Sequence, residues 1–120
     1  MKRLLIVIDK APNIGYHCGT IVGEALRAAI ALAGMDIDTT VVLVNDAVFA
    51  VLKEHKVQGT GIKDLDQFMK DAEEFGLKVQ VHLESAQKRG ILDYQLADIG
   101  TLSTERLAQL VHEADSTITF

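Results

Sequence analysis

The apolar run Leu4-Leu5-Ile6-Val7-Ile8, followed by Asp9-Lys10-Ala11-Pro12-Asn13-Ile14-Gly15-Tyr16-His17-Cys18-Gly19, is the strongest structural signal in this chain. Five apolar residues bounded by charge are typical of a fully buried strand. The segment after them contains the sequence's only proline and only cysteine. Residues 20–35 then have helical composition, and we expect a helix from Gly19 or Thr20 to Gly34. Strand, loop and helix in this order open an α/β fold, in which ligands bind beyond the carboxyl ends of the strands.

The composition of the 120 residues is that of one small globular domain over residues 1–120, with 48% apolar and 24% charged residues. The formal net charge of −5 weighs against nucleic acid as a partner, because binding a polyanion requires a basic surface. The first apolar run stops at Asp9, too early for a signal peptide, and no run approaches the ~20 residues of a membrane span. A single cysteine fits a reducing compartment. We therefore expect a cytoplasmic protein that does not interact with membranes.

Strand and helix patterns alternate along the rest of the chain. They predict further strands over residues 38–44, 78–83, 97–102 and 117–120, and helices over 46–54, 64–75 and 85–88. A last helix opens at Ser103, with Leu107, Leu110 and Val111 expected to face inward. This alternation predicts a three-layer α/β/α sandwich with a mainly parallel sheet of about five strands.

Cys18 is the single thiol, and two interpretations of it remain open. If the helix begins at Gly19, the thiol lies at a helix N-terminus, where the dipole favours the thiolate, and His17 adds to this effect. Cys18 would then be a candidate catalytic residue with a reactive thiolate. The interpretation we favour is a half-buried cysteine that packs as a small hydrophobic residue.

Polar residues also follow the second and third predicted strands. Asn45 and Asp46 stand where α/β sites form, although the plainer interpretation is a helix cap. Arg89 closes the short helix and either holds an anion or a partner's carboxylate, or has a structural role.

A metal site is the least favoured interpretation of the histidines. His82 and Glu84 lie two residues apart and would need His17 and Cys18 to complete a zinc site. No spacing in the sequence fixes such a site, so we expect no metal and no cofactor.

Several short pieces, in order, resemble a known family. They are Lys2–Val7 with Lys10-Ala11-Pro12, then Gly23–Ala29, Asn45–Phe49, Val79–Val81 leading into Ser85–Ile91, and Ala114-Asp115 before Thr119-Phe120. The chain resembles the DsrE/DsrF/DsrH family of sulfur-relay proteins, and within it the DsrF or TusC branch.

This resemblance implies an α/β/α domain that assembles into homo-oligomers (dimers, trimers or hexamers) or with sister DsrE- or DsrH-like subunits. In the catalytic branch a cysteine just after the third main strand accepts sulfane sulfur. The matching position here is Ser85, and a serine cannot carry a persulfide. The resemblance therefore implies an accessory or scaffold subunit of a sulfur relay, without independent activity. We expect the ligand- or partner-binding residues to be Lys10, His17, Gly19, Asn45, Asp46, His82, Ser85 and Arg89.

Two alternatives stay open at this point. One is a sulfur carrier that uses Cys18 as the acceptor. The other is a small-ligand-binding oligomer whose pocket is formed by the loops after Ile8, Val44 and Leu83.

Overall fold

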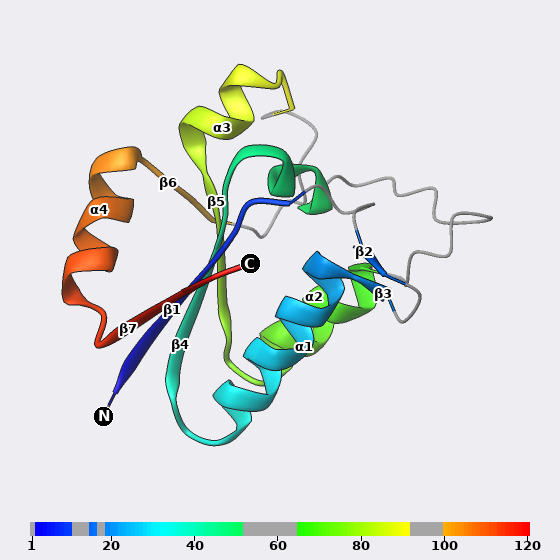
Figure 1. Cartoon of the computed structure of the whole chain (residues 1–120), viewed down its shortest axis with the longest axis vertical. Helices are drawn as coiled ribbons and strands as arrows, with labels where there is room; N and C mark the ends of the chain where they lie inside the picture. Colours follow the sequence, from blue (N-terminus) through cyan, green and yellow to red (C-terminus); the bar gives the residue numbers. More distant parts are fainter. Residues whose placement is uncertain (1, 11–14, 17–18, 52–64, 92–99) are drawn as a thin grey trace.

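Five parallel strands form the central sheet of the computed structural model, with helices on both of its faces (Figure 1). The structure describes residues 2–10, 15–16, 19–51, 65–91 and 100–120. The strands run in the order β6-β5-β4-β1-β7 across the sheet. Their bounds are Arg3–Ile8 for β1, Asp38–Leu43 for β4, Lys78–His82 for β5, Gly100–Leu102 for β6 and Ser116–Thr119 for β7. The predicted α/β sandwich with a mainly parallel sheet is confirmed.

The helices divide unequally between the two faces. Helices α1 (Ile21–Gly34) and α2 (Leu65–Glu74) lie on one face, and α4 (Thr104–Glu113) lies on the other (Figure 1). The short helix α3 (Leu83–Lys88) and the 3-10 helix η1 (Asn45–Val51) follow the carboxyl ends of β5 and β4. A small antiparallel ribbon of β2 (Gly15–Tyr16) and β3 (Gly19–Thr20) precedes α1.

Three predicted boundaries differ from the structure. The first helix begins at Ile21 rather than at Gly19 or Thr20, because both residues pair in the β2–β3 ribbon. The segment after β4 is helical as predicted, but it is a 3-10 helix that begins at Asn45, which has a positive φ of 51°. Leu83 opens α3 and does not end the third predicted strand.

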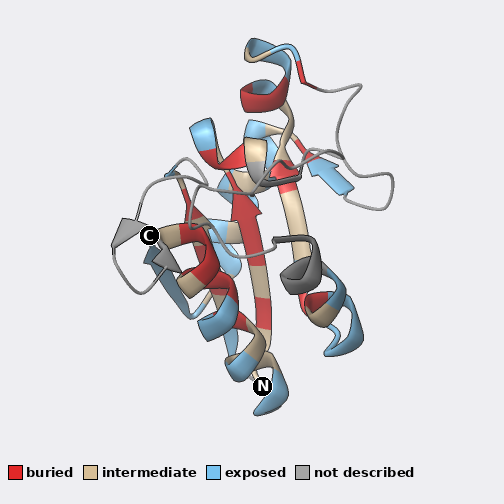
Figure 2. Ribbon diagram, turned by 90° about the vertical axis from the view of Figure 1, so that its right-hand side faces the viewer, coloured by how far each residue is buried: buried red, intermediate tan, exposed pale blue. Residues whose placement is uncertain are grey.

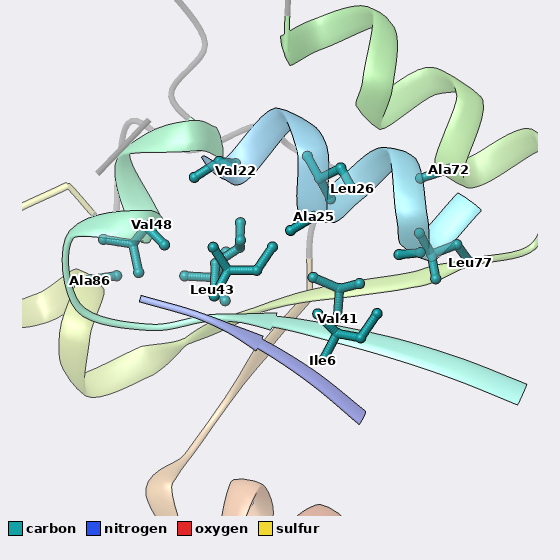
Figure 3. Packing of buried hydrophobic residues seen from close by; sticks show 14 of the residues in the cluster. Ile6, Val22, Ala25, Leu26, Val41, Leu43, Val48, Ala72, Leu77 and Ala86 are labelled. Atoms are coloured by element: carbon teal, nitrogen blue, oxygen red, sulfur yellow. The ribbon is translucent and has the colours of Figure 1, made fainter. Parts of the chain in front are cut away.

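The main core lies between the sheet and α1. Leu43 and Ile6 are fully buried there against Val22, Ala25 and Leu26 of α1 (Figure 3). The central strands β1 and β4 are largely buried, whereas the outer sides of the helices are exposed (Figure 2). Burial of branched side chains from consecutive strands accounts for the continuous apolar runs in the sequence.

The second face of the sheet has a smaller core under α4. Leu5, Val42 and Leu102 are buried there, with Leu107, Leu110 and Ala114 partly buried against them. Val111, which we expected to face inward, is 47% exposed. The preceding residue, Leu110, packs against this core. Because successive side chains on a helix differ in direction by about 100°, Val111 points away from the sheet.

Candidate functional site

A hydrogen-bonded cluster centred on Ser85 joins the carboxyl ends of β4 and β5. Ser85 lies in the first turn of α3 and is only 5% exposed. Its Oγ lies 2.6 Å from Nδ1 of His82, the last residue of β5. The backbone N–H of Asn45, at the start of η1, donates to the same Oγ over 3.0 Å. One buried hydroxyl therefore connects three elements that meet at the end of the sheet where α/β sites form.

The second ring nitrogen of His82 faces oxygen atoms. Nε2 lies 2.8 Å from Oε2 of Glu84 and 2.8 Å from Oγ1 of Thr104, the first residue of α4. An ionised carboxylate only accepts hydrogen bonds, so Nε2 carries a proton. In the neutral ring Nδ1 is then the acceptor, and Ser85 donates its hydroxyl proton to it. The partners of His82 thus fix its tautomer.

Glu84 accepts several hydrogen bonds through one oxygen. Its Oε2 receives the Thr104 hydroxyl over 2.8 Å and the Thr104 backbone N–H over 2.9 Å. The hydroxyl bond is the main cause that lowers the pKa of Glu84 below its ordinary value. Backbone hydrogen bonds and the charge of His82 lower this pKa further, while partial desolvation opposes them.

The pKa of Glu84 gives a direct test of this part of the cluster. Thr104→Val removes the hydroxyl and should raise the Glu84 pKa towards its ordinary value. A lowered folded-state pKa contributes stability above the unfolded-state pKa, and that contribution is lost as the pH falls through the folded-state pKa. The variant should therefore lose less stability on acidification, which carboxyl NMR titration and urea unfolding at about pH 7 and about pH 3 would measure.

Thr117→Val is the control, because it removes the same kind of hydroxyl from an exposed residue of β7. β7 is the edge strand on the side of the sheet opposite to β5 and β6. An unchanged Glu84 pKa in Thr104→Val would contradict the assigned hydrogen bond.

Arg89 closes the cluster on the side of η1. Its Nε donates to Oδ1 of Asp46 over 3.0 Å, and its Nη1 donates to the backbone oxygen of Ser85 over 3.3 Å. The Asp46 side chain is 59% exposed, so the ion pair itself is worth no more than about 1 kcal/mol. Its effect is geometric: the guanidinium ties α3 to η1 beside Ser85. Asp46 and Arg89 are thus each other's partners in this structure.

The predicted site residues fall into two groups. The structure brings together five of them, which are Asn45, Asp46, His82, Ser85 and Arg89. Lys10 instead forms an ion pair with Asp9 over 3.0 Å at the end of β1. Gly19 lies in β3, and His17 and Cys18 lie outside the described residues.

The prediction missed Thr104 and the part that Glu84 plays beside it. The sequence indicated only that Glu84 and Thr104 each follow a predicted strand. In the structure these strands, β5 and β6, are neighbours in the sheet, so the residues after them meet. The sequence did not reveal this neighbourhood, because the order of strands in a sheet is set by tertiary packing.

The metal interpretation gains no support from the part of the chain that the structure describes. No group of three or more His, Cys, Asp or Glu residues is arranged there to hold a metal ion. Two of the four residues considered for zinc, His17 and Cys18, are not among the described residues.

The chemistry that this cluster supports depends on the γ atom at position 85. A hydroxyl there donates to His82, which in turn donates to Glu84, an order that polarises a nucleophile in hydrolases. Here, however, the oxygen is buried and already accepts the Asn45 N–H. The Ser85 hydroxyl therefore joins three elements. A more acidic group at the same position, such as a thiol, would have His82 as a base and the Asn45 N–H as a hydrogen-bond donor.

Comparisons with known proteins agree with this architecture. A family model described as the DsrE/DsrF-like family matches residues 2–120. Among solved structures, the crystal structure of the ychN protein from E. coli is similar, with a TM-score of 0.85 and 28% sequence identity over 100% of both chains. No curated protein matches the sequence.

Proposed function

Because the chain belongs to the DsrE/DsrF-like family, we propose that it is an accessory or scaffold subunit of an intracellular sulfur-relay oligomer, of the DsrF or TusC type. Membership of this family supports a role related to sulfur relay in general. The finer proposal, that this chain supports the relay without accepting sulfur, depends on one position. Ser85 stands where the resemblance places the acceptor cysteine, and its hydroxyl is buried and hydrogen-bonded to His82 and Asn45.

The chemical reason is the nature of the γ atom. Sulfane sulfur moves when a thiolate attacks the outer sulfur of a persulfide, and a serine hydroxyl remains protonated and forms no persulfide. The surrounding cluster still holds α3, η1 and the start of α4 in one arrangement. Such a rigid surface suits a subunit that positions its partners.

Assembly is the second part of the proposal. Met35 and Phe75, near the ends of α1 and α2, are 70% and 55% exposed in the single chain. The four residues of β7 are all exposed as well. Large exposed apolar side chains favour an assembly, and we propose a homo-oligomer that also admits sister DsrE- or DsrH-like subunits. Among the described residues, no helix has the length and apolar character required to cross a membrane.

The decisive experiment offers sulfur to the native protein. The chain is incubated with a low-molecular-weight persulfide, and intact mass is recorded for native protein and for protein unfolded in denaturant at the same pH. We expect the native chain to gain sulfur no faster than the unfolded chain, because the only thiol, Cys18, then has no site that activates it. Sedimentation of the same sample should show an oligomer.

The Cys18→Ser variant is the control, since it removes every thiol and sets the background of the mass measurement. Faster persulfide formation in the native state than in the unfolded state, abolished by Cys18→Ser, would overturn the accessory role. It would establish the alternative in which Cys18 is a sulfur carrier.

A further inference from the structure

The sheet face beneath α4 changes character across its strands. On β1 and β4 it has an apolar part, in which Leu5 and Val42 are buried. Towards β5 it has a polar half: Lys78 pairs in register with Thr40, and Gln80 with Val42. A purely apolar partner placed over this polar half would bury polar groups without hydrogen-bond partners, which is unfavourable. This half of the face is therefore suited to a polar occupant.

A hollow of about 460 Å³ lies between this polar half and the first turns of α4. Residues from the strands and from α4 line it, and the described ones include no carboxylate: Thr40, Lys78, Gln80, Thr101, Leu102, Ser103, Arg106 and Leu110. Lys78 comes from β5 and Arg106 from α4, so the two cations reach the hollow from different elements. The two carboxylates nearby, Asp38 and Glu113, line an adjoining hollow that shares Lys78 and Arg106.

The cations are held only loosely by protein partners. Lys78 is 67% exposed, and its Nζ lies 3.8 Å from Oδ1 of Asp38, which lines an adjoining hollow of about 240 Å³. Within the described part of the chain, the Arg106 side chain donates from Nη1 to Oε1 of Gln109 over 2.9 Å. A guanidinium has five N–H donors, so Arg106 retains capacity for an anionic oxygen.

The other lining residues fit an organic anion better than a bare inorganic one. The Ser103 Oγ accepts the backbone N–H of Arg106 over 3.2 Å and keeps its own proton for a ligand. Leu102 and Leu110 provide apolar surface at the same hollow. The N-terminus of α4 adds partial positive charge beside Ser103.

We propose that this hollow binds a small organic anion whose phosphate or carboxylate group contacts Lys78 and Arg106 and whose apolar part packs on Leu102 and Leu110. The hollow lies on the sheet face beneath α4, whereas the Ser85 cluster lies at the carboxyl ends of β4 and β5, and Ser103 of the hollow directly precedes Thr104 of the cluster. The hollow also differs from the sequence-based expectation of a pocket at the loops after Ile8, Val44 and Leu83. None of the described residues that line it belongs to the Ser85 cluster, so the test of the hollow does not depend on the proposed sulfur-relay role.

Phenyl phosphate is a suitable probe, because it combines an anionic group with an apolar ring. Titration into the isotope-labelled native oligomer should shift the backbone amide signals of Gln80, Thr101 and Ser103 in a saturable way. Lys78→Gln and Arg106→Gln should each weaken the affinity about tenfold, as expected for loss of one charge-assisted contact. Lys70→Gln on α2 removes the same charge from the opposite face and should leave the affinity unchanged.

Parallel titrations with benzoate and inorganic phosphate identify the anionic group and the need for an apolar part. Stronger binding of phenyl phosphate than of inorganic phosphate supports the role of the two leucines, and comparison with benzoate separates phosphate from carboxylate recognition. Shifts spread over lysines on the whole surface, or an affinity equal in Lys78→Gln, Arg106→Gln and Lys70→Gln, would overturn the proposal. Thermal unfolding of each variant verifies that it is folded.

Discussion

Ser85→Cys, made together with Cys18→Ser, is expected to turn this chain into a sulfur acceptor. The introduced thiol would replace the Oγ that now lies 2.6 Å from His82 Nδ1 and accepts the Asn45 N–H, so it would have the same two neighbours at the longer distances that sulfur requires. A base and an N–H donor both favour the thiolate, so its pKa should fall below the ~8.5 of a free cysteine, although burial opposes this shift. The Cys18→Ser protein with Ser85 retained should gain no sulfur.

The reaction balances without a further oxidant or reductant. The thiolate attacks the outer sulfur of a donor persulfide, a new sulfur–sulfur bond forms on the protein, the donor's sulfur–sulfur bond breaks, and the donor leaves as its thiol. Intact mass should therefore increase by one sulfur atom, and alkylation rates measured across pH give the thiol pKa.

His82→Gln in the same double variant separates activation from mere presence of a thiol. Glutamine keeps a polar side chain at position 82 but supplies no base, so alkylation of the introduced thiol at neutral pH should slow about tenfold or more. If the double variant gains no sulfur while it remains folded, position 85 is not the equivalent of the acceptor position, and the proposed accessory role loses its main support.

The second large effect concerns stability. Leu43→Ala on β4 should lower the free energy of unfolding by about 2.7–5 kcal/mol, because it removes a fully buried side chain and leaves a cavity. Leu43 belongs to the main core together with Val22 of α1 and Val48 of η1 (Figure 3). Since a domain of this size is stable by about 5–15 kcal/mol in total, the variant should be marginal. Urea unfolding at one fixed protomer concentration measures the difference.

Val111→Ala is the control for this prediction. Val111 is 47% exposed on α4 and is not among the residues proposed for assembly, and an exposed substitution changes stability by about 0.5 kcal/mol or less. A cost below about 1 kcal/mol for Leu43→Ala would contradict the packing described between β4, α1 and η1.

The sequence predicted the sheet well because its signals are strong and local. The run from Leu4 to Ile8 and the β-branched run over residues 39–44 are typical of buried strands. The helix predicted over residues 64–75 ends as expected, because Gly76, directly after it, has a positive φ of 74°.

The same reasoning failed where the outcome depended on pairing between segments. The predicted helix start at Gly19 or Thr20 is a short ribbon, in which these residues pair with Tyr16 and Gly15. Thr104 entered the cluster through Glu84 and His82, from which it is separated by 20 and 22 residues. Contacts between chain segments that only the folded sheet brings together have no periodic signature in the sequence.

The parallel pairing of β1 with β7 has a consequence for the order in which the protein forms during synthesis. Leu4 pairs with Ser116, so one side of β1 acquires its partner only after residues 116–119 have left the ribosome. On its other side β1 can pair with β4 as soon as residues 38–43 emerge. Until translation reaches β7, an apolar strand therefore presents an unpaired edge to other nascent chains, and chaperone binding to stalled chains that end before Ser116 should be stronger than to longer ones.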